Sequence, residues 1–183
     1  MDLSQAARRH YASDETGRLM QAIDAMREAL RQLTTQAGQT GTATRTLAEV
    51  ADVVRKAARR ISGADGVAFV LRDNEQCWYF DEDAIGPLWK GKRFPLTACI
   101  SGWAMLNRQT VIIPDIYLDD RIPHDAYRPT FVKSLVMVPI RQTDPVGAIG
   151  TYWAKNRLPS EEELSILQAL DQAGAIDGEL QVI

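Results

Sequence analysis

The chain is poor in cysteine, with only Cys77 and Cys99 among its 183 residues. Two thiols are too few for a disulfide framework, and no cluster of histidine or cysteine supplies the four ligands of a structural zinc site. The sequence therefore predicts no metal centre. Both cysteines fit a reducing compartment, where free thiols persist.

The chain also lacks an excess of basic residues and any long apolar run. Twenty-one Lys and Arg against 24 Asp and Glu give a formal net charge of −3, so no overall positive field attracts nucleic acid. The longest apolar stretches, such as 134–140 and 146–154, fall well short of the roughly 20 residues that span a bilayer. No basic segment leading into an apolar one opens the chain, as a secretory signal would require. We expect a cytoplasmic protein with no membrane span and no nucleic-acid partner.

The segment between Asp14 and Gln36 has a helical pattern of apolar residues. Five apolar residues alternate in spacing between four and three, as in a coiled-coil seam: Leu19, Ile23, Met26, Leu30 and Leu33. A stretch rich in Gly and Thr follows and predicts a linker. We therefore divide the chain into a segment with a coiled-coil-type helix at 1–36, a linker at 37–46 and a globular domain at 47–183.

The globular domain reads as an α+β fold. Short β-like runs are joined by hairpin turns rather than by regularly alternating crossover helices, which favours a central antiparallel sheet with helices packed on one face. Two hairpins are expected, 66–72 with 76–80 and 134–141 with 146–153. A single strand is expected at 110–113 and a long polar connection at 115–132.

Three helices accompany these strands. Apolar residues at helical spacing predict a helix at 46–61. Ser101 is expected to cap a short helix that runs to Leu106. Ser160 and Glu163 have the spacing of a capping box at the start of the last helix.

The segment from about 47 to 183 closely resembles a GAF domain, the small-molecule sensor module of bacterial signalling proteins. The resemblance is carried by a combination of short motifs: Gly66 to Leu71, Trp89-Lys90-Gly91, Phe94-Pro95-Leu96, Cys99 to Ala104, Pro114-Asp115-Ile116, Arg121 to His124, Ser134 to Ile140 and Gly147 to Gly150. The combination is most similar to GAF domains that precede histidine kinases in two-component systems. It implies an α+β fold that binds a small ligand and regulates an attached kinase.

A second resemblance lies upstream. Asp2-Leu3-Ser4 and the segment from Asp14 to Leu19, with Ala22, Met26 and Leu30, resemble the connector and second helix of a HAMP signal-relay module. The alternative is an ordinary coiled-coil signalling helix with the same pattern. Either one implies a parallel homodimer.

The GAF resemblance also implies a ligand cavity between the sheet and the segments 101–106 and 115–132. The ligand-binding residues expected there are Tyr79, Trp103, Asp115, Tyr127 and Phe131, because an apolar pocket with a few polar groups is typical of small-molecule sites. No phosphoacceptor helix or ATP-binding motif is recognisable. We therefore expect no enzyme activity in this chain, with any kinase activity in another domain, and leave the ligand and any cofactor unknown.

Two alternatives remain open. The chain could be a structural dimerisation and relay module that binds no ligand, or a haem or redox sensor. Cys99 precedes a helix whose dipole could lower its pKa, although a buried free cysteine usually acts as a small hydrophobe. His124 is a candidate haem ligand or a hydrogen-bonding group within its loop. Cys77 shares a strand face with Tyr79 and is expected to point at a core or pocket, and the full motif set of GAF-type methionine sulfoxide reductases is not recognisable.

Overall fold

The computed structural model describes residues 47–141 and 143–174, so the predictions made for 1–36 and for the whole linker at 37–46 lie outside the described residues. The elements in chain order are α2 (Leu47–Ser62), β1 (Gly66–Asp73), β2 (Gln76–Ala84), β3 (Arg93–Pro95), η1 (Leu96–Ala98), α3 (Ile100–Asn107), β4 (Val111–Ile113), η2 (Ile116–Leu118), α4 (His124–Tyr127), β5 (Ser134–Ile140), β6 (Gly147–Trp153) and α5 (Glu161–Gly174). Within the described ranges, every helix is too short or too polar to cross a bilayer.

The strands form one six-stranded sheet in the order β3-β2-β1-β6-β5-β4. Every neighbouring pair is antiparallel, so the predicted α+β class and both predicted hairpins are confirmed. The two hairpins meet at the centre, where β1 pairs with β6 from Gly66 opposite Tyr152 to Leu71 opposite Gly147. The centre of the sheet thus joins residues about 80 positions apart in the sequence.

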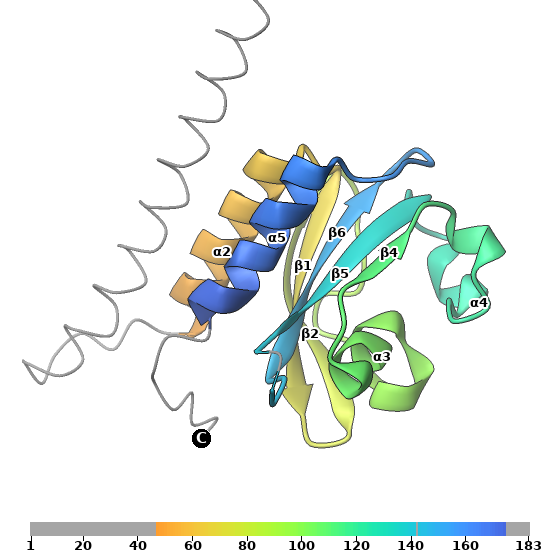
Figure 1. Cartoon of the computed structure of the whole chain (residues 1–183). Coiled ribbons are helices and arrows are strands. Elements are labelled where there is room, and N and C mark those ends of the chain that lie inside the picture. Colours follow the sequence, from red (N-terminus) through yellow and green to blue (C-terminus); the bar gives the residue numbers. More distant parts are fainter. Residues whose placement is uncertain (1–46, 142, 175–183) are drawn as a thin grey trace, which may run out of the picture. The chain divides into compact units, whose positions relative to one another are not determined.

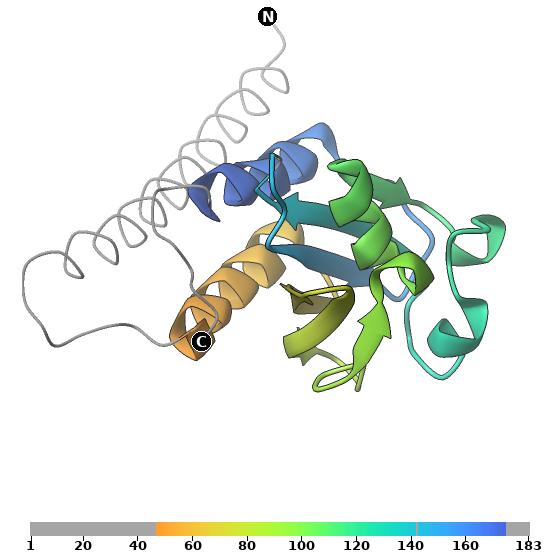
Figure 2. The same cartoon turned by 90° about the horizontal axis from the view of Figure 1, so that it is seen from below.

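Both faces of the sheet are covered (Figures 1 and 2). The long helices α2 and α5 pack side by side on one face, whereas α3 and the connection 115–132 lie on the other. All seven residues of β5 and all seven of β6 are consequently buried. The continuous apolar runs of these strands are typical of strands that are covered on both sides.

Local signals set the helix ends. Gly63 follows α2 with a φ of 57°, a left-handed conformation that glycine adopts without steric cost. The capping box of α5 is confirmed, because the Ser160 backbone N–H donates to Glu163 Oε2 at 2.7 Å and the Glu163 N–H donates to Ser160 Oγ at 3.1 Å. The cap predicted for α3 is wrong. Cys99 is its N-cap residue, and Ser101 lies in the first turn with its side chain turned into the core.

Replacement of the capping serine gives the first prediction. Ser160→Ala is expected to lower the free energy of unfolding by about 1 kcal/mol, because one side-chain acceptor of the first turn is lost. Ser165→Ala is the matched control, since Ser165 is exposed within α5 and its change is expected to be near zero. Urea unfolding followed by circular dichroism measures both variants. Equal midpoints for the two variants would contradict the capping role.

A β-bulge in β2 decides which side chains face which layer. Tyr79 and Asp81 pair with consecutive residues of β1, so Phe80 has no partner across the ladder. The extra residue changes the alternation of the strand. Tyr79 faces the side of α3, whereas Asp81 and Asp83 beyond the bulge reach α2. Without the bulge, these two carboxylates would share the buried face of Tyr79.

Candidate functional site

Six polar side chains are gathered on the sheet face that α3 covers, and we call them the hydroxyl–thiol cluster. They come from β2, from the start of α3, from α4 and from β6, and all are buried: Cys77, Tyr79, Cys99, Ser101, Tyr127 and Tyr152. Apolar residues of the core surround them. Elements distant in sequence therefore bring three phenols, two thiols and one hydroxyl into a single region.

Part of the cluster is hydrogen-bonded around Ser101. Its Oγ lies 2.8 Å from the Tyr79 hydroxyl and 3.4 Å from Cys99 Sγ. Cys99 Sγ also lies 3.6 Å from the carbonyl oxygen of Pro95. Ser101 thus links strand β2 to the first turn of α3 through a side chain that is fully buried.

The other two phenols have no partner. Tyr127 and Tyr152 are 3% and 0% exposed, and no group in the described part of the chain hydrogen-bonds to either hydroxyl. Burial raises the pKa of both tyrosines, so both keep their protons and remain donors. A buried hydroxyl without a partner costs about 1–3 kcal/mol. These two hydroxyls are therefore the groups in the cluster that a bound molecule could satisfy.

The ring of Trp89 packs against the rings of all three tyrosines. Its ring centroid lies 4.6 Å from that of Tyr127, 5.5 Å from that of Tyr79 and 5.7 Å from that of Tyr152. Its indole N–H donates to the carbonyl oxygen of Ala126 at 3.2 Å. Trp89 therefore holds the segment 115–132, which we call the covering segment, against the sheet.

The five residues predicted to bind a ligand divide into three groups. Tyr79 and Tyr127 belong to the cluster. Trp103 and Phe131 are partly buried and pack at its margin, with the Arg121 guanidinium 4.6 Å above the Trp103 ring. Asp115 lies outside the core cluster.

Asp115 caps the turn η2 and lies outside the core cluster. One carboxylate oxygen accepts from the Tyr117 backbone N–H at 2.9 Å, and the other accepts from Asn156 Nδ2 at 2.7 Å. Short acidic side chains favour such capping positions. Both oxygens of Asp115 are therefore engaged in holding the covering segment.

His124 makes a hydrogen bond within its own loop, which is one of the two roles that the sequence suggested for it. Its Nε2 lies 2.9 Å from the carbonyl oxygen of Ile116, which joins α4 to η2. The ring also lies 5.7 Å from that of Tyr117, outside the hydroxyl–thiol cluster. In this arrangement Nε2 donates to a backbone carbonyl, and the lone pair of the ring is on Nδ1.

Sequence reasoning did not select Tyr152, Trp89, Cys77 or Ser101 as site residues. The sequence does contain a feature that points to Tyr152, namely Gly150, which lies two residues earlier on the same face of β6. A Cβ at Gly150 would lie 2.3 Å from the Tyr152 hydroxyl, so glycine provides the space into which that hydroxyl points. A glycine two residues before a buried tyrosine in a strand is thus informative.

The two thiols of the cluster differ in acidity. Hydrogen bonds to Cys99 from Cys77, from Ser101 and from the backbone N–H groups that begin α3 lower the pKa of the Cys99 thiol to about 6. The hydrogen bond to Cys99, together with burial, raises the pKa of Cys77. Cys99 is therefore the thiol that ionises first.

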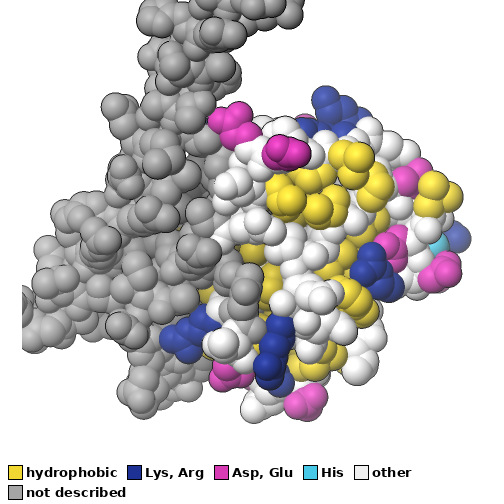
Figure 3. Space-filling model, in the orientation of Figure 1, with side chains coloured by type: hydrophobic (Ala, Val, Ile, Leu, Met, Phe, Trp, Pro, Cys, Tyr) yellow, Lys and Arg dark blue, Asp and Glu magenta, His cyan; other side chains and the backbone are white. Residues whose placement is uncertain are grey.

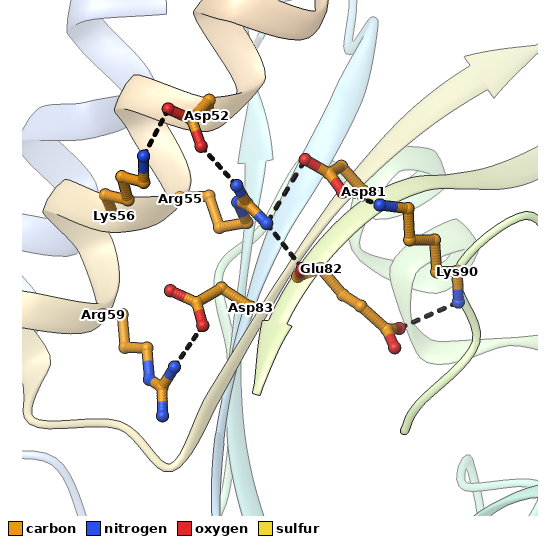
Figure 4. A network of polar contacts seen from close by, with 8 residues as sticks. All are labelled: Asp52, Arg55, Lys56, Arg59, Asp81, Glu82, Asp83 and Lys90. Carbon is orange, nitrogen blue, oxygen red and sulfur yellow. Dashed lines mark hydrogen bonds and ion pairs between the residues drawn. The ribbon is translucent and has the colours of Figure 1, made fainter. Parts of the chain in front are cut away.

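A network of charges connects this face of the sheet to α2 (Figure 4). Arg55 of α2 donates to the carbonyl oxygen of Glu82 at 2.6 Å and pairs with Asp81 at 3.3 Å. Asp81 also pairs with Lys90 Nζ at 2.7 Å. The Glu82 carboxylate accepts three backbone N–H groups, from Leu88, Trp89 and Lys90, at 2.8–3.0 Å. Trp89 thus contacts the tyrosines through its ring and β2 through its backbone.

The surface is electrostatically mixed. On the face shown in Figure 3, the described Lys and Arg side chains are interspersed with Asp and Glu and form no continuous basic patch. A basic stripe is the usual footprint of a nucleic-acid interface. This face offers none within the described residues.

The sequence was compared with known protein families and with curated proteins. The sequence model of one family, described as a GAF domain, matches residues 44–176. No match was found among curated proteins.

Solved structures resemble the fold. The GAF-B domain of DevS from Mycobacterium smegmatis is 20% identical, with 70% of this chain and 90% of that chain covered and a TM-score of 0.57. The GAF domain of a phosphoenolpyruvate-protein phosphotransferase from Coxiella burnetii is 16% identical, with 84% and 92% covered and a TM-score of 0.62. The free methionine-R-sulfoxide reductase of Thermoplasma acidophilum is 17% identical, with 70% and 88% covered and a TM-score of 0.59. At these identities the similarity shows the fold alone.

Proposed function

The chain belongs to the GAF domain family, a ligand-binding sensory fold of signalling proteins, and from this premise we propose that it senses a small uncharged molecule. The ligand would bind between the covering segment and the sheet, against Tyr127 and Tyr152. Occupancy would regulate an attached output domain, such as a histidine kinase, through the dimer helices. In this proposal the chain is cytoplasmic and homodimeric and has no enzyme activity of its own.

The observation that carries the proposal is the pair of unpartnered buried hydroxyls. Tyr127 belongs to the covering segment and Tyr152 to β6, so a ligand acceptor that engages both would join the segment to the sheet. Such a contact has a favourable energy that the free protein lacks. A ligand that binds one arrangement of the covering segment better than another shifts the population towards that arrangement.

The surroundings of the hydroxyls support an uncharged ligand. Apart from the tyrosines and cysteines of the cluster, the buried polar residues among those described are Ser62, Ser101, Ser134 and Thr151, and no Asp, Glu, Lys or Arg is among them. The Glu82 carboxylate near Tyr152 is already satisfied by three backbone N–H groups. An anionic ligand would lose its hydration here without gaining a counter-ion, at a cost of several kcal/mol, and an ammonium group offers no acceptor to the two unpartnered O–H groups. A compact molecule with one or two neutral acceptor groups fits better.

The charge network of Figure 4 supports a route from the ligand to α2. Trp89 packs on Tyr127 and Tyr152, and its backbone is held by Glu82, whose carbonyl oxygen accepts from Arg55. A shift of Trp89 on ligand binding would thus act on Arg55 through one residue. Coupling of this kind requires that the ligand favour one arrangement of the network over another.

Arg55→Ala tests this route. The substitution is expected to leave ligand affinity within about threefold of wild type while it abolishes the ligand-induced change in hydrogen exchange of α2, because the polar link between β2 and the helix is gone. Lys56→Ala is the control, since Lys56 is 66% exposed and pairs only with Asp52 among the described residues. Mass spectrometry of deuterium uptake reads out α2. An unchanged ligand response in the Arg55 variant would contradict the route.

A thermal-shift screen tests the proposed ligand class. We expect neutral compounds with carbonyl or amide acceptors to raise the melting temperature, and matched carboxylates and amines to leave it unchanged. A broad library in which no compound raises the melting temperature would favour the structural dimerisation alternative. Stabilisation by charged compounds alone would contradict the inferred ligand class.

A further inference from the structure

The two cysteines are brought together by the path of the chain after β3. Cys77 lies opposite Phe94 in the β2–β3 pairing. The chain leaves β3 at Pro95, makes the single turn η1 and reaches Cys99 at the start of α3. The Leu96 N–H donates to the Glu75 carbonyl oxygen at 2.9 Å, which holds this turn beside β2. One short turn therefore separates Cys99 from the strand that pairs with Cys77.

The side chains around the two cysteines also lie close together. Cys77 and Tyr79 share a strand face, and the Tyr79 hydroxyl meets Ser101 Oγ, which lies 3.4 Å from Cys99 Sγ. Both cysteines lie in the same buried core cluster, and each is the largest influence on the pKa of the other. Both cysteines are free in this structure. The pair thus consists of two reduced thiols in one buried cluster, held by separate elements.

We propose that Cys77 and Cys99 are a peroxide-responsive dithiol that closes to an intrachain disulfide between β2 and the start of α3. This inference concerns a modification site and does not depend on the proposed ligand. It differs from the single-cysteine redox alternative because it assigns a role to each thiol.

The roles follow from acidity and access. Cys99 has the lowered pKa and is 7% exposed, whereas Cys77 has the raised pKa and is 0% exposed. Thiolates are the nucleophiles that attack peroxides. Cys99 is therefore the attacking residue, and Cys77 is the resolving residue.

The reaction balances in two steps. The Cys99 thiolate attacks one oxygen of hydrogen peroxide, the O–O bond breaks, and hydroxide leaves as Cys99 becomes a sulfenic acid. The Cys77 sulfur then attacks the sulfenic sulfur, and the hydroxyl leaves with the Cys77 proton as water. Two thiols lose two electrons in total, and one peroxide is reduced to two waters. A later thiol reductant reverses the bond by exchange.

The disulfide would constrain the ligand face. It would tie β2 to the first turn of α3 next to the Tyr79–Ser101 hydrogen bond, where the structure has only noncovalent contacts. Because Cys99 precedes Ser101 by two residues, any shift of the α3 start moves that hydrogen bond as well. The oxidation state of the pair would thereby adjust the same face that carries Tyr127 and Tyr152.

The experiment titrates the reduced full chain with hydrogen peroxide, blocks free thiols with N-ethylmaleimide in denaturant and maps the peptides without reduction. We expect a Cys77–Cys99 linked peptide that dithiothreitol removes. In Cys77→Ser, dimedone is expected to trap a sulfenic acid at Cys99. In Cys99→Ser, Cys77 is expected to oxidise at least tenfold more slowly than Cys99 does in wild type.

Several results would overturn the proposal. One is that both thiols of the wild-type chain still react with maleimide after excess peroxide. Another is that Cys99 is over-oxidised while Cys77 stays a free thiol. A third is that the disulfide forms between two chains. Equal oxidation rates for Cys77 in wild type and in Cys99→Ser would overturn the assigned roles. The wild-type peptide map alone decides whether the bond forms, so a variant that fails to fold does not remove the test.

Discussion

Gly102→Ala is expected to lower the free energy of unfolding by about 3 kcal/mol, at the upper end of the cost of overpacking. A Cβ at Gly102 would lie 1.8 Å from the Leu96 carbonyl oxygen and 2.5 Å from its carbonyl carbon. These are backbone atoms of the turn η1 and cannot rotate away as a flexible side chain would. Relief requires α3 to move away from η1, which would also displace Ser101. Urea unfolding measures the change as a lower midpoint.

Gly86→Ala is the matched control for this loss. The nearest atom to a Cβ at Gly86 is a ring carbon of Phe131 at 3.7 Å, an ordinary van der Waals distance. Its free energy of unfolding is expected to stay within about 0.5 kcal/mol of wild type, as for most substitutions that meet no steric obstacle. If Gly102→Ala unfolds at the midpoint of Gly86→Ala, α3 does not pack on η1 as described, and the arrangement of Ser101 and Cys99 is wrong as well.

Tyr127→Phe and Tyr152→Phe are expected to separate ligand binding from stability. Each removes a buried hydroxyl that no described protein group satisfies, so the ligand-free chain is expected to keep its stability or gain up to about 1 kcal/mol. Each also removes a donor to the ligand. For a compound found in the thermal-shift screen, we expect affinity to fall about tenfold in each variant, which titration calorimetry measures.

Tyr79→Phe is the control, because its hydroxyl has a partner in Ser101 at 2.8 Å. Loss of this buried hydrogen bond is expected to destabilise the free chain by about 1 kcal/mol, since Ser101 Oγ then loses a partner. The sign of the change thus differs between partnered and unpartnered tyrosines. If Tyr152→Phe loses as much stability as Tyr79→Phe, its hydroxyl is already bonded in the free protein and gives no reason for a ligand there.

Local patterns in the sequence predicted the local structure well. The spacing of Ser160 and Glu163 gave a true capping box, and turn residues between β-like runs gave both hairpins. Strand alternation placed Cys77 and Tyr79 on one buried face. Each of these features depends on residues close together in the chain, where side-chain chemistry and periodicity determine the outcome.

Features that depend on distant contacts were not predictable in this way. The pairing of β1 with β6 joins segments about 80 positions apart, and no local pattern distinguishes it from other antiparallel orders. The bulge at Phe80 redirects Asp81 towards α2, although simple alternation would place Asp81 with Tyr79. Asp115 was expected to face a ligand, yet the turn that follows uses its carboxylate as a cap. The candidate site therefore depends most on contacts that tertiary packing creates.

A crystal structure of the chain with a compound that raises its melting temperature tests the central claim most directly. We expect the compound between the covering segment and β6, with neutral acceptor atoms about 3 Å from the hydroxyls of both Tyr127 and Tyr152. We also expect Trp89 to shift relative to Glu82 when the compound is bound. A compound bound elsewhere on the domain, with both hydroxyls still unpartnered, would contradict the account.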